Sequence, residues 1–287
     1  MSTPITPQLV KQLRDRTDQP MGLCKQALEQ SGGDIDKAIE WLRAQNAKMG
    51  VKREGSETAE GRIGLFYDNS QRIAAIVEVR CETAPSAKSD PFIALVNDLA
   101  RHIASSQAPD VPTLLAERYD PSGTVQDRLN DTMGVIREKM VIHRFARLHG
   151  GIYGGYIHFD GTVGTLVECQ GSGPNDELLR DVAAHITAMN PPYRTPQDVP
   201  AEVIEKEKAL IRAEIEADPK NAGKPANILD KIAEGKLKTR LAELVLSEQA
   251  MANAQKYPNM SVSDALKKAG LELTRFVRYK VGAISLV

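Results

Sequence analysis

Two segments, LVNDLARHI at residues 95–103 and LLRDVAAHI at residues 178–186, align without a gap. Their leucine, aspartate, alanine, histidine and isoleucine match at a constant offset along the chain. Apolar residues recur at helical spacing in both segments. Each segment also follows two strand-like segments joined by a turn, and this shared order makes a chance match less plausible. The repeat therefore predicts an α+β fold with two related hairpin-plus-helix subdomains packed together.

The other elements of these subdomains follow from local patterns. Strands are predicted at residues 62–67, 72–80, 140–148, 152–159 and 162–170, and helices at about 90–103, 124–138 and 177–189. The second hairpin has the clearer signal, because Asp160-Gly161 stands between alternating apolar residues. We expect the first core subdomain to span residues 62–138 and the second to span residues 139–199.

The N-terminal residues 1–46 are predicted to form a separate three-helix module. Thr6 can cap the first helix with Pro7 at its first position, and Gly32-Gly33 can end the second. Asp34 can cap the third helix, which has apolar residues at helical spacing. Residues 47–61 are polar, contain glycine and lack periodicity, so they are predicted to be a linker.

The C-terminal part changes in character at Pro200. Residues 201–217 and 226–251 are predicted helices around a short turn, which is typical of an antiparallel helical hairpin inserted at residues 200–251. A thin apolar seam and many charges suggest that this hairpin projects from the body. Residues 252–287 are expected to complete the second subdomain with a short helix capped by Ser261 and a strand at residues 271–281.

Composition restricts the function. The 287 residues contain 37 Lys+Arg and 38 Asp+Glu, a balance that does not favour nucleic-acid binding. The start of the chain does not resemble a signal peptide, and no apolar run approaches the length of a membrane span. Three cysteines lie far apart, which disfavours a disulfide framework or a cysteine zinc site. We therefore expect a cytoplasmic protein that contacts neither membrane nor nucleic acid directly.

Motifs for an active site are missing. The sequence has no phosphate loop, no HExxH and no GxSxG elbow, so we predict no catalytic residue, no metal site and no cofactor. His102 and His185 stand at equivalent repeat positions, and packing or a helix-surface role is favoured over metal binding for both. Cys24 stands among apolar positions and is more easily explained as core than as a nucleophile. The pattern favours a non-enzymatic protein that binds a partner at separated points.

Five segments, in order along the chain, carry a resemblance to a known family. They are Leu9–Thr17, Val77–Thr83, Asp198–Glu207, Lys231–Leu237 and Phe276–Gly282. Together they resemble the bacterial-type elongation factor Ts family over essentially the whole chain. The resemblance implies that the N-terminal module is similar to the ubiquitin-associated fold. It also implies a guanine-nucleotide exchange factor that binds elongation factor Tu in its GDP-bound and nucleotide-free states and disturbs the partner's magnesium and phosphate site.

The resemblance also implies which residues act. The exchange loop, which would approach the partner's magnesium site, corresponds to Thr83, Ala84, Pro85 and Ser86. The partner-binding positions correspond to Arg14, Met21, Gly22, Met133, Gly134 and His158. The family usually has Asp-Phe-Val after Cys-x-Thr, whereas this chain has Ala84-Pro85-Ser86.

This departure leaves two interpretations of the exchange loop open. The loop either only connects a strand to a helix, or still reaches the magnesium site with a smaller wedge and weaker exchange. The alternative function is a non-enzymatic adaptor or scaffold that binds another protein through the N-terminal module.

Overall fold

The computed structural model describes residues 4–283 except 54, 122 and 174. The chain divides into two compact units. The first unit comprises the chain up to His149, Ile157–Gly164 and the chain from Tyr279 on, and the second comprises Gly150–Tyr156 and Thr165–Arg278.

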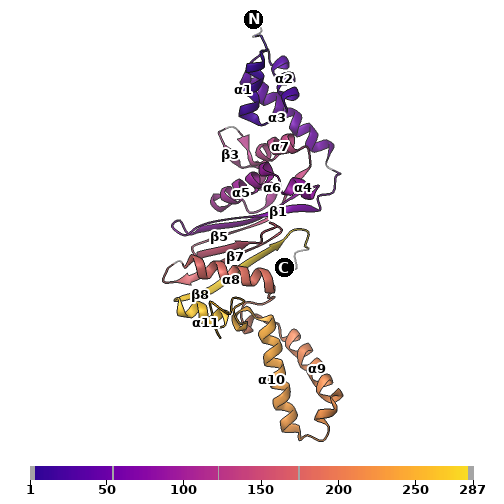
Figure 1. Ribbon diagram of the computed structural model, residues 1–287, viewed down its shortest axis with the longest axis vertical. Helices are drawn as coiled ribbons and strands as arrows, with labels where there is room; N and C mark the ends of the chain where they lie inside the picture. The colour runs from indigo at the N-terminus through magenta and orange to yellow at the C-terminus, as the bar shows by residue number, and fades with distance from the viewer. Residues whose placement is uncertain (1–3, 54, 122, 174, 284–287) are drawn as a thin grey trace. The chain divides into compact units, whose positions relative to one another are not determined.

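The N-terminal module of the first unit contains α1 (Pro7–Thr17), α2 (Met21–Gln30) and α3 (Ile35–Lys52), which lie together in Figure 1. The Thr6 hydroxyl accepts a hydrogen bond from the Leu9 N–H, as the capping pattern predicts. A small apolar core joins the helices and consists of Val10, Leu13, Cys24, Ala27, Leu28, Ala38 and Leu42. The assignment of Cys24 to the core is thus confirmed.

Helix α3 continues through the first part of the segment that the sequence suggested as a linker. It ends at Lys52, and β1 (Glu60–Asp68) begins before the expected end of the linker at Gly61. Ala47, Lys48 and Met49 are good helix formers, and Met49 packs against the larger apolar core of the first unit. Only a short connection therefore separates the module from the first strand.

The first sheet has the order β1-β2-β5, with β2 (Ile73–Cys81) in the centre and β5 (Met140–His149) at one edge. Both pairings are antiparallel. The sequence placed residues 140–148 in the second subdomain, whereas β5 pairs with β2 over nearly its full length. Alternation along a strand shows that one face is buried but does not identify the neighbouring strand.

Helices cover one face of this sheet (Figure 1). They are α4 (Ala84–Ala87), α5 (Asp90–Ser105), α6 (Val111–Ala116) and α7 (Val125–Ile136), with the short strands β3 (Arg118–Asp120) and β4 (Gly123–Thr124) between α6 and α7. The packing of α5 on β1 is close, because a Cβ on Gly64 would lie 2.6 Å from a Val96 side-chain atom. Thr124 and Asp127 form a capping box that fixes the start of α7.

A buried ionic cluster lies within the first unit. The Glu78 side chain is 0% exposed and accepts hydrogen bonds from Arg80 Nε and Arg144 Nε, each at 2.7 Å. The Gly282 N–H also donates to this carboxylate, and the Arg144 guanidinium lies 4.3 Å from the centroid of the Tyr279 ring. The cluster therefore binds a late segment of the chain to the first sheet.

The second sheet has the order β6-β7-β8, formed by β6 (Ile152–Ile157), β7 (Val163–Gly171) and β8 (Leu271–Lys280). The second unit also contains α8 (Asp176–Met189) and the short α11 (Val262–Lys268). Leu179, Val182 and Ile186 of α8 contribute to its apolar core, together with Leu266 of α11. In both repeats a hairpin precedes a helix, and a third strand lies beside the second strand of the hairpin.

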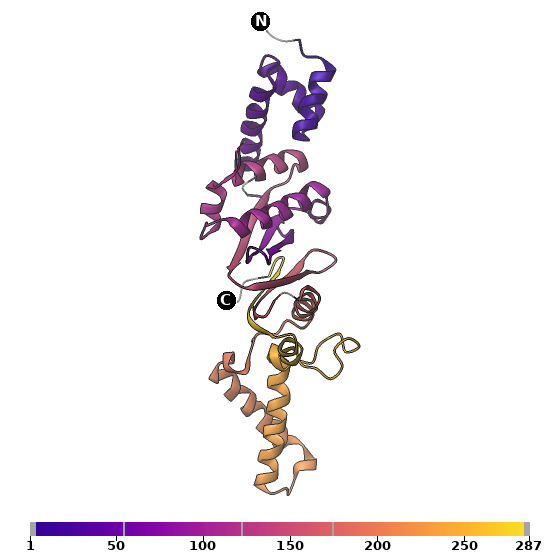
Figure 2. The ribbon, with the colours of Figure 1, turned by 90° about the vertical axis from the view of Figure 1, so that its left-hand side faces the viewer.

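Two long helices form an antiparallel pair that extends away from the rest of the second unit (Figure 2). These are α9 (Ala201–Ala217) and α10 (Ala226–Leu244), and no residue of α10 is buried. Ion pairs contribute to the contact between them, with Arg240 2.9 Å from Glu207 and Lys236 3.2 Å from Glu214. Helix α10 ends at Leu244, before the predicted limit at residue 251, and a 3-10 turn at Leu246–Glu248 follows it.

His185 anchors the segment that follows this helix pair. The side chain is 1% exposed, and its Nδ1 accepts a hydrogen bond from the Ala252 N–H. Its Nε2 must therefore carry the proton and donate to Gln249 Oε1 at 2.8 Å. His102, at the matching repeat position, instead lies 3.3 Å from the Glu117 carboxylate. The sequence-based preference for packing is confirmed at His185.

Burial lowers the pKa of His185 below its ordinary value of 6.5. The unfolded chain then binds more protons than the folded chain near and below that pH, so stability decreases as pH falls through this window. We expect the wild type to lose up to about 1.4 kcal/mol more per pH unit below about pH 6.5 than His185→Gln. Chemical denaturation at pH 7.5 and 5.5 measures the difference. The exposed His149→Gln control should lose stability as the wild type does, and an equal loss in His185→Gln would contradict the prediction.

Candidate functional site

The candidate exchange loop, Thr83–Ser86, is more ordered than a simple connection. Thr83 is the cap residue of α4, and Ala84, Pro85 and Ser86 all lie in that short helix, with proline near its start. Thr83 and Pro85 are exposed, whereas Ala84 and Ser86 are half-buried. The loop therefore presents a small proline ring on a fixed backbone.

Two carboxylates hold the start of this loop. Glu138 accepts hydrogen bonds from both the N–H and the hydroxyl of Thr83. Glu82 accepts a hydrogen bond from the Lys139 N–H, which is the first cause of its lowered pKa, and also binds Arg53 at 2.8 Å. Burial, with Glu138 next, raises the pKa of Cys81 to about 12. The thiol beside the loop is therefore not a candidate nucleophile.

The predicted contact residues of the module lie on its surface. Arg14 on α1 and Gly22 on α2 are exposed, and the Met21 side chain is 46% exposed. An exposed methionine at the start of a helix is available for an interface, because its flexible apolar side chain adapts to different surfaces.

Met133 and Gly134 occupy a different environment from the one the resemblance implies. Met133 is 5% exposed and belongs to the core beneath α5 and α7. Gly134 is buried against α3, where an added Cβ would lie 2.3 Å from the Asn46 side-chain oxygen. Both residues thus contribute to packing inside the first unit, and their partner-binding role stays a prediction. Helical spacing alone does not show which face of α7 is covered.

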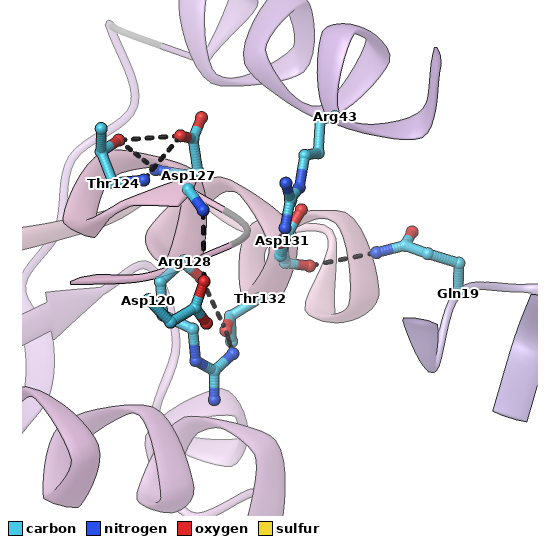
Figure 3. Close-up of polar contacts among 9 residues, drawn as sticks. Gln19, Arg43, Asp120, Thr124, Asp127, Arg128, Asp131 and Thr132 are labelled. Atoms are coloured by element: carbon cyan, nitrogen blue, oxygen red, sulfur yellow. Dashed lines mark hydrogen bonds and ion pairs between the residues drawn. The ribbon is translucent and has the colours of Figure 1, made fainter. Parts of the chain in front are cut away.

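A polar contact attaches the module to α7 (Figure 3). Gln19 donates from Nε2 to the main-chain oxygen of Asp131 at 3.1 Å, and Arg43 lies 3.4 Å from the Asp131 carboxylate. Burial raises the pKa of Asp131, and Arg43 opposes that effect. The buried Asn46 side chain lies beside Gly134 in the same contact. The three-helix module is thus docked on α7 through α3 and the connection between α1 and α2.

The turn after β6 carries His158 and an exposed aromatic residue that the sequence analysis did not single out. Phe159 is 87% exposed, and its ring centroid lies 4.5 Å from that of His158. The turn is tightly defined, because Gly161 donates to the His158 oxygen and Asp160 accepts from the Thr162 N–H. The turn itself does not require an aromatic side chain at this position. Proximity to the strong Asp-Gly signal could have marked Phe159 as surface-exposed.

Groups for metal or thiol chemistry are not gathered in the described part of the chain. Within it, histidine, cysteine, aspartate and glutamate side chains form no cluster of three or more that could hold a metal ion. Cys24, Cys81 and Cys169 are all buried and free. None of the helices that the structure describes is both long enough and apolar enough to cross a membrane.

Comparison with known proteins gives a consistent result along the chain. The family model described as elongation factor TS matches residues 82–283. Elongation factor Ts of Thermobifida fusca is 38% identical over 278 residues, covering 95% of this chain and 96% of that protein. Elongation factor Ts of Methylococcus capsulatus is 39% identical over 281 residues, covering 97% and 92% respectively. The same name belongs to a protein of Azotobacter vinelandii that is 37% identical over 278 residues, covering 97% of this chain and 91% of that protein.

An α+β protein with these relatives is a translation elongation factor. Within that class, the chain belongs to the elongation factor Ts family.

Proposed function

We propose that this chain is a guanine-nucleotide exchange factor for elongation factor Tu and that it promotes GDP release by disturbing the partner's magnesium and phosphate site. The observation that carries the proposal is the similarity to proteins named elongation factor Ts over nearly the whole chain. Such a factor acts by binding and needs no covalent chemistry. A protein that binds the nucleotide-free state more tightly must weaken nucleotide affinity by the same factor.

The proposed contact surface combines three places within the first unit. The module contributes Arg14 with Met21 and Gly22, the exchange loop contributes Thr83–Ser86, and the turn after β6 contributes His158 with Phe159. All three places present side chains or backbone to solvent. Separated contacts of this kind suit a factor that must hold one part of a partner while moving another.

The test is the release of a fluorescent GDP analogue from the cognate elongation factor Tu in the presence of excess unlabelled GDP. The chain is expected to accelerate release and to form a complex on gel filtration after the nucleotide is removed. A release rate equal to that of elongation factor Tu alone, with no complex, would refute the proposal. The double variant Arg14→Ala with His158→Ala then tests the contact surface, because unchanged affinity would show that these positions are wrong.

The adaptor hypothesis is supported less well. An independent adaptor module needs freedom from the rest of its chain, whereas Gln19 and Arg43 attach this module to Asp131. A fragment that ends at Lys52 should bind elongation factor Tu far more weakly than the full chain. Equal affinity of fragment and full chain would favour the adaptor.

Phe159→Ala is expected to weaken binding to nucleotide-free elongation factor Tu by about tenfold, because a well-exposed aromatic side chain can bury a large apolar area at low conformational cost. Isothermal titration calorimetry measures the affinity. Met189→Ala provides a control, since Met189 is also an exposed large apolar side chain but lies in the second unit. Affinity losses of equal size in both variants would contradict a specific role for Phe159.

A further inference from the structure

Two short segments of the first unit, Glu82–Thr83 and Glu138–Lys139, are joined by hydrogen bonds beside the exchange loop and form a clamp. One carboxylate, that of Glu138, receives both donors of Thr83, with the N–H 3.0 Å from Oε2 and the hydroxyl 2.7 Å from Oε1. In the opposite direction, the Lys139 N–H donates to Glu82 Oε1 at 2.6 Å. Each segment thus contributes one residue that donates and one residue that accepts. This reciprocal pattern fixes the backbone immediately before α4.

Glu138 is itself held in place. It stands between the end of α7 at Ile136 and the start of β5 at Met140. Arg137 ends the helix in a left-handed conformation at φ 69°, and its N–H donates to the Met133 oxygen. Met133 and Met140 are both buried in the core of the first unit. Glu138 therefore lies in a short connection whose two ends are held by the buried core.

The bonds act at the point where the loop's direction is set. Thr83 is the cap residue of α4, and its own side chain caps no backbone N–H of that helix. Its N–H and its hydroxyl are directed to Glu138 instead, and the hydroxyl also lies 3.3 Å from Ser86 Oγ. A helix of only four residues has little stability of its own, so its orientation depends on the bonds at its ends.

We infer that Glu138 is a positioning residue for nucleotide exchange, which holds Thr83 so that Ala84–Ser86 meet the partner in one fixed orientation. This inference rests on the proposed exchange function. Hydrogen bonds to a charged acceptor are stronger than neutral ones, so a single carboxylate with two donors can control a short loop. A preorganised loop lowers the entropy lost when the open state of the partner is stabilised.

The experiment measures GDP release from elongation factor Tu over a range of factor concentrations. Glu138→Ala removes both hydrogen bonds that Thr83 donates to this carboxylate, so it should lower the maximal release rate by at least about tenfold, the effect of losing a single charge-assisted hydrogen bond, while the half-saturating concentration changes by less than about threefold. Glu138→Gln should recover part of the rate, because its amide oxygen can still accept one hydrogen bond from Thr83. Thr83→Val should lower the rate less than Glu138→Ala, since it keeps the N–H donor.

Glu216→Ala, an exposed carboxylate on α9, is the matched control and should leave both parameters unchanged. A double-mutant cycle of Thr83→Val and Glu138→Ala should be non-additive, because both remove the same hydrogen bond. A maximal rate within twofold of wild type for Glu138→Ala, or rate and affinity falling together with thermal stability, would overturn the inference alone. A wild-type chain without exchange activity would overturn it together with the proposed function.

Discussion

Replacing Glu78 by alanine is expected to lower the free energy of unfolding by about 3–5 kcal/mol. The carboxylate is fully buried and lies between two arginines, Arg80 and Arg144. Its removal would leave two guanidinium groups in a poorly solvated site without their shared counter-charge, and this uncompensated charge is the origin of the penalty. Urea denaturation followed by circular dichroism measures the change.

The control for this prediction is an exposed ion pair. Asp36 lies 3.2 Å from Arg16, and its side chain is 84% exposed, so Asp36→Ala should cost no more than about 1 kcal/mol. Removing Arg144 together with Glu78 should lower the free energy of unfolding by less than the sum of the two single changes. Only the Arg80 guanidinium then lacks its counter-charge in the cluster. A decrease in the free energy of unfolding below about 1 kcal/mol in Glu78→Ala would show that solvent reaches the cluster and that Glu78 is not buried in solution.

Installing the family's usual residues in the exchange loop is expected to raise the rate of GDP release. In the double variant Ala84→Asp with Pro85→Phe, an apolar ring would project from the exposed position of residue 85. An interface hot spot contributes about 2 kcal/mol, which corresponds to roughly a thirtyfold change in rate if the ring acts in the open state of the partner. Stopped-flow measurement with the cognate elongation factor Tu tests the prediction.

The control for the loop is Pro85→Ala, which changes the backbone preference without adding a ring. If this change alone raises the rate, the gain comes from loop flexibility and not from the new side chain. An unchanged or lower rate in the double variant would mean that the partner has adapted to Ala84-Pro85 or that the loop does not touch it. The assignment of Thr83–Ser86 as the exchange loop should then be abandoned.

Local signals predicted much of the secondary structure. The predicted capping residues Thr6 and Ser261 stand at the starts of helices, and Asp160-Gly161 lies in the turn between two strands. Such features depend on neighbours in sequence, where hydrogen-bond geometry and permitted backbone angles act directly. Elements fixed in this way can be recognised without knowing the rest of the fold.

Features that depend on distant partners were harder to predict. The alternation in residues 140–148 is correct for a strand, but nothing local identifies β2 as its neighbour. In the same way, nothing local to Gly134 indicates that Asn46 of α3 lies against it, or that Met133 is buried in the core. Glu78 looks like an ordinary polar residue in a strand until Arg144 is placed beside it. The candidate site was predicted as a set of segments, whereas the clamp between Glu82–Thr83 and Glu138–Lys139 required the structure.

The division of the chain has a consequence for its synthesis. Tyr279–Gly282 follow all of the second unit in chain order, yet they belong to the first unit, where Gly282 donates to Glu78. A growing chain on the ribosome could therefore form the helical module early, since its apolar core lies within residues 10–42. The charge on Glu78 would have its full set of partners only after residue 282 has emerged. During translation the first unit should remain open to chaperones and proteases for longer than its early start suggests.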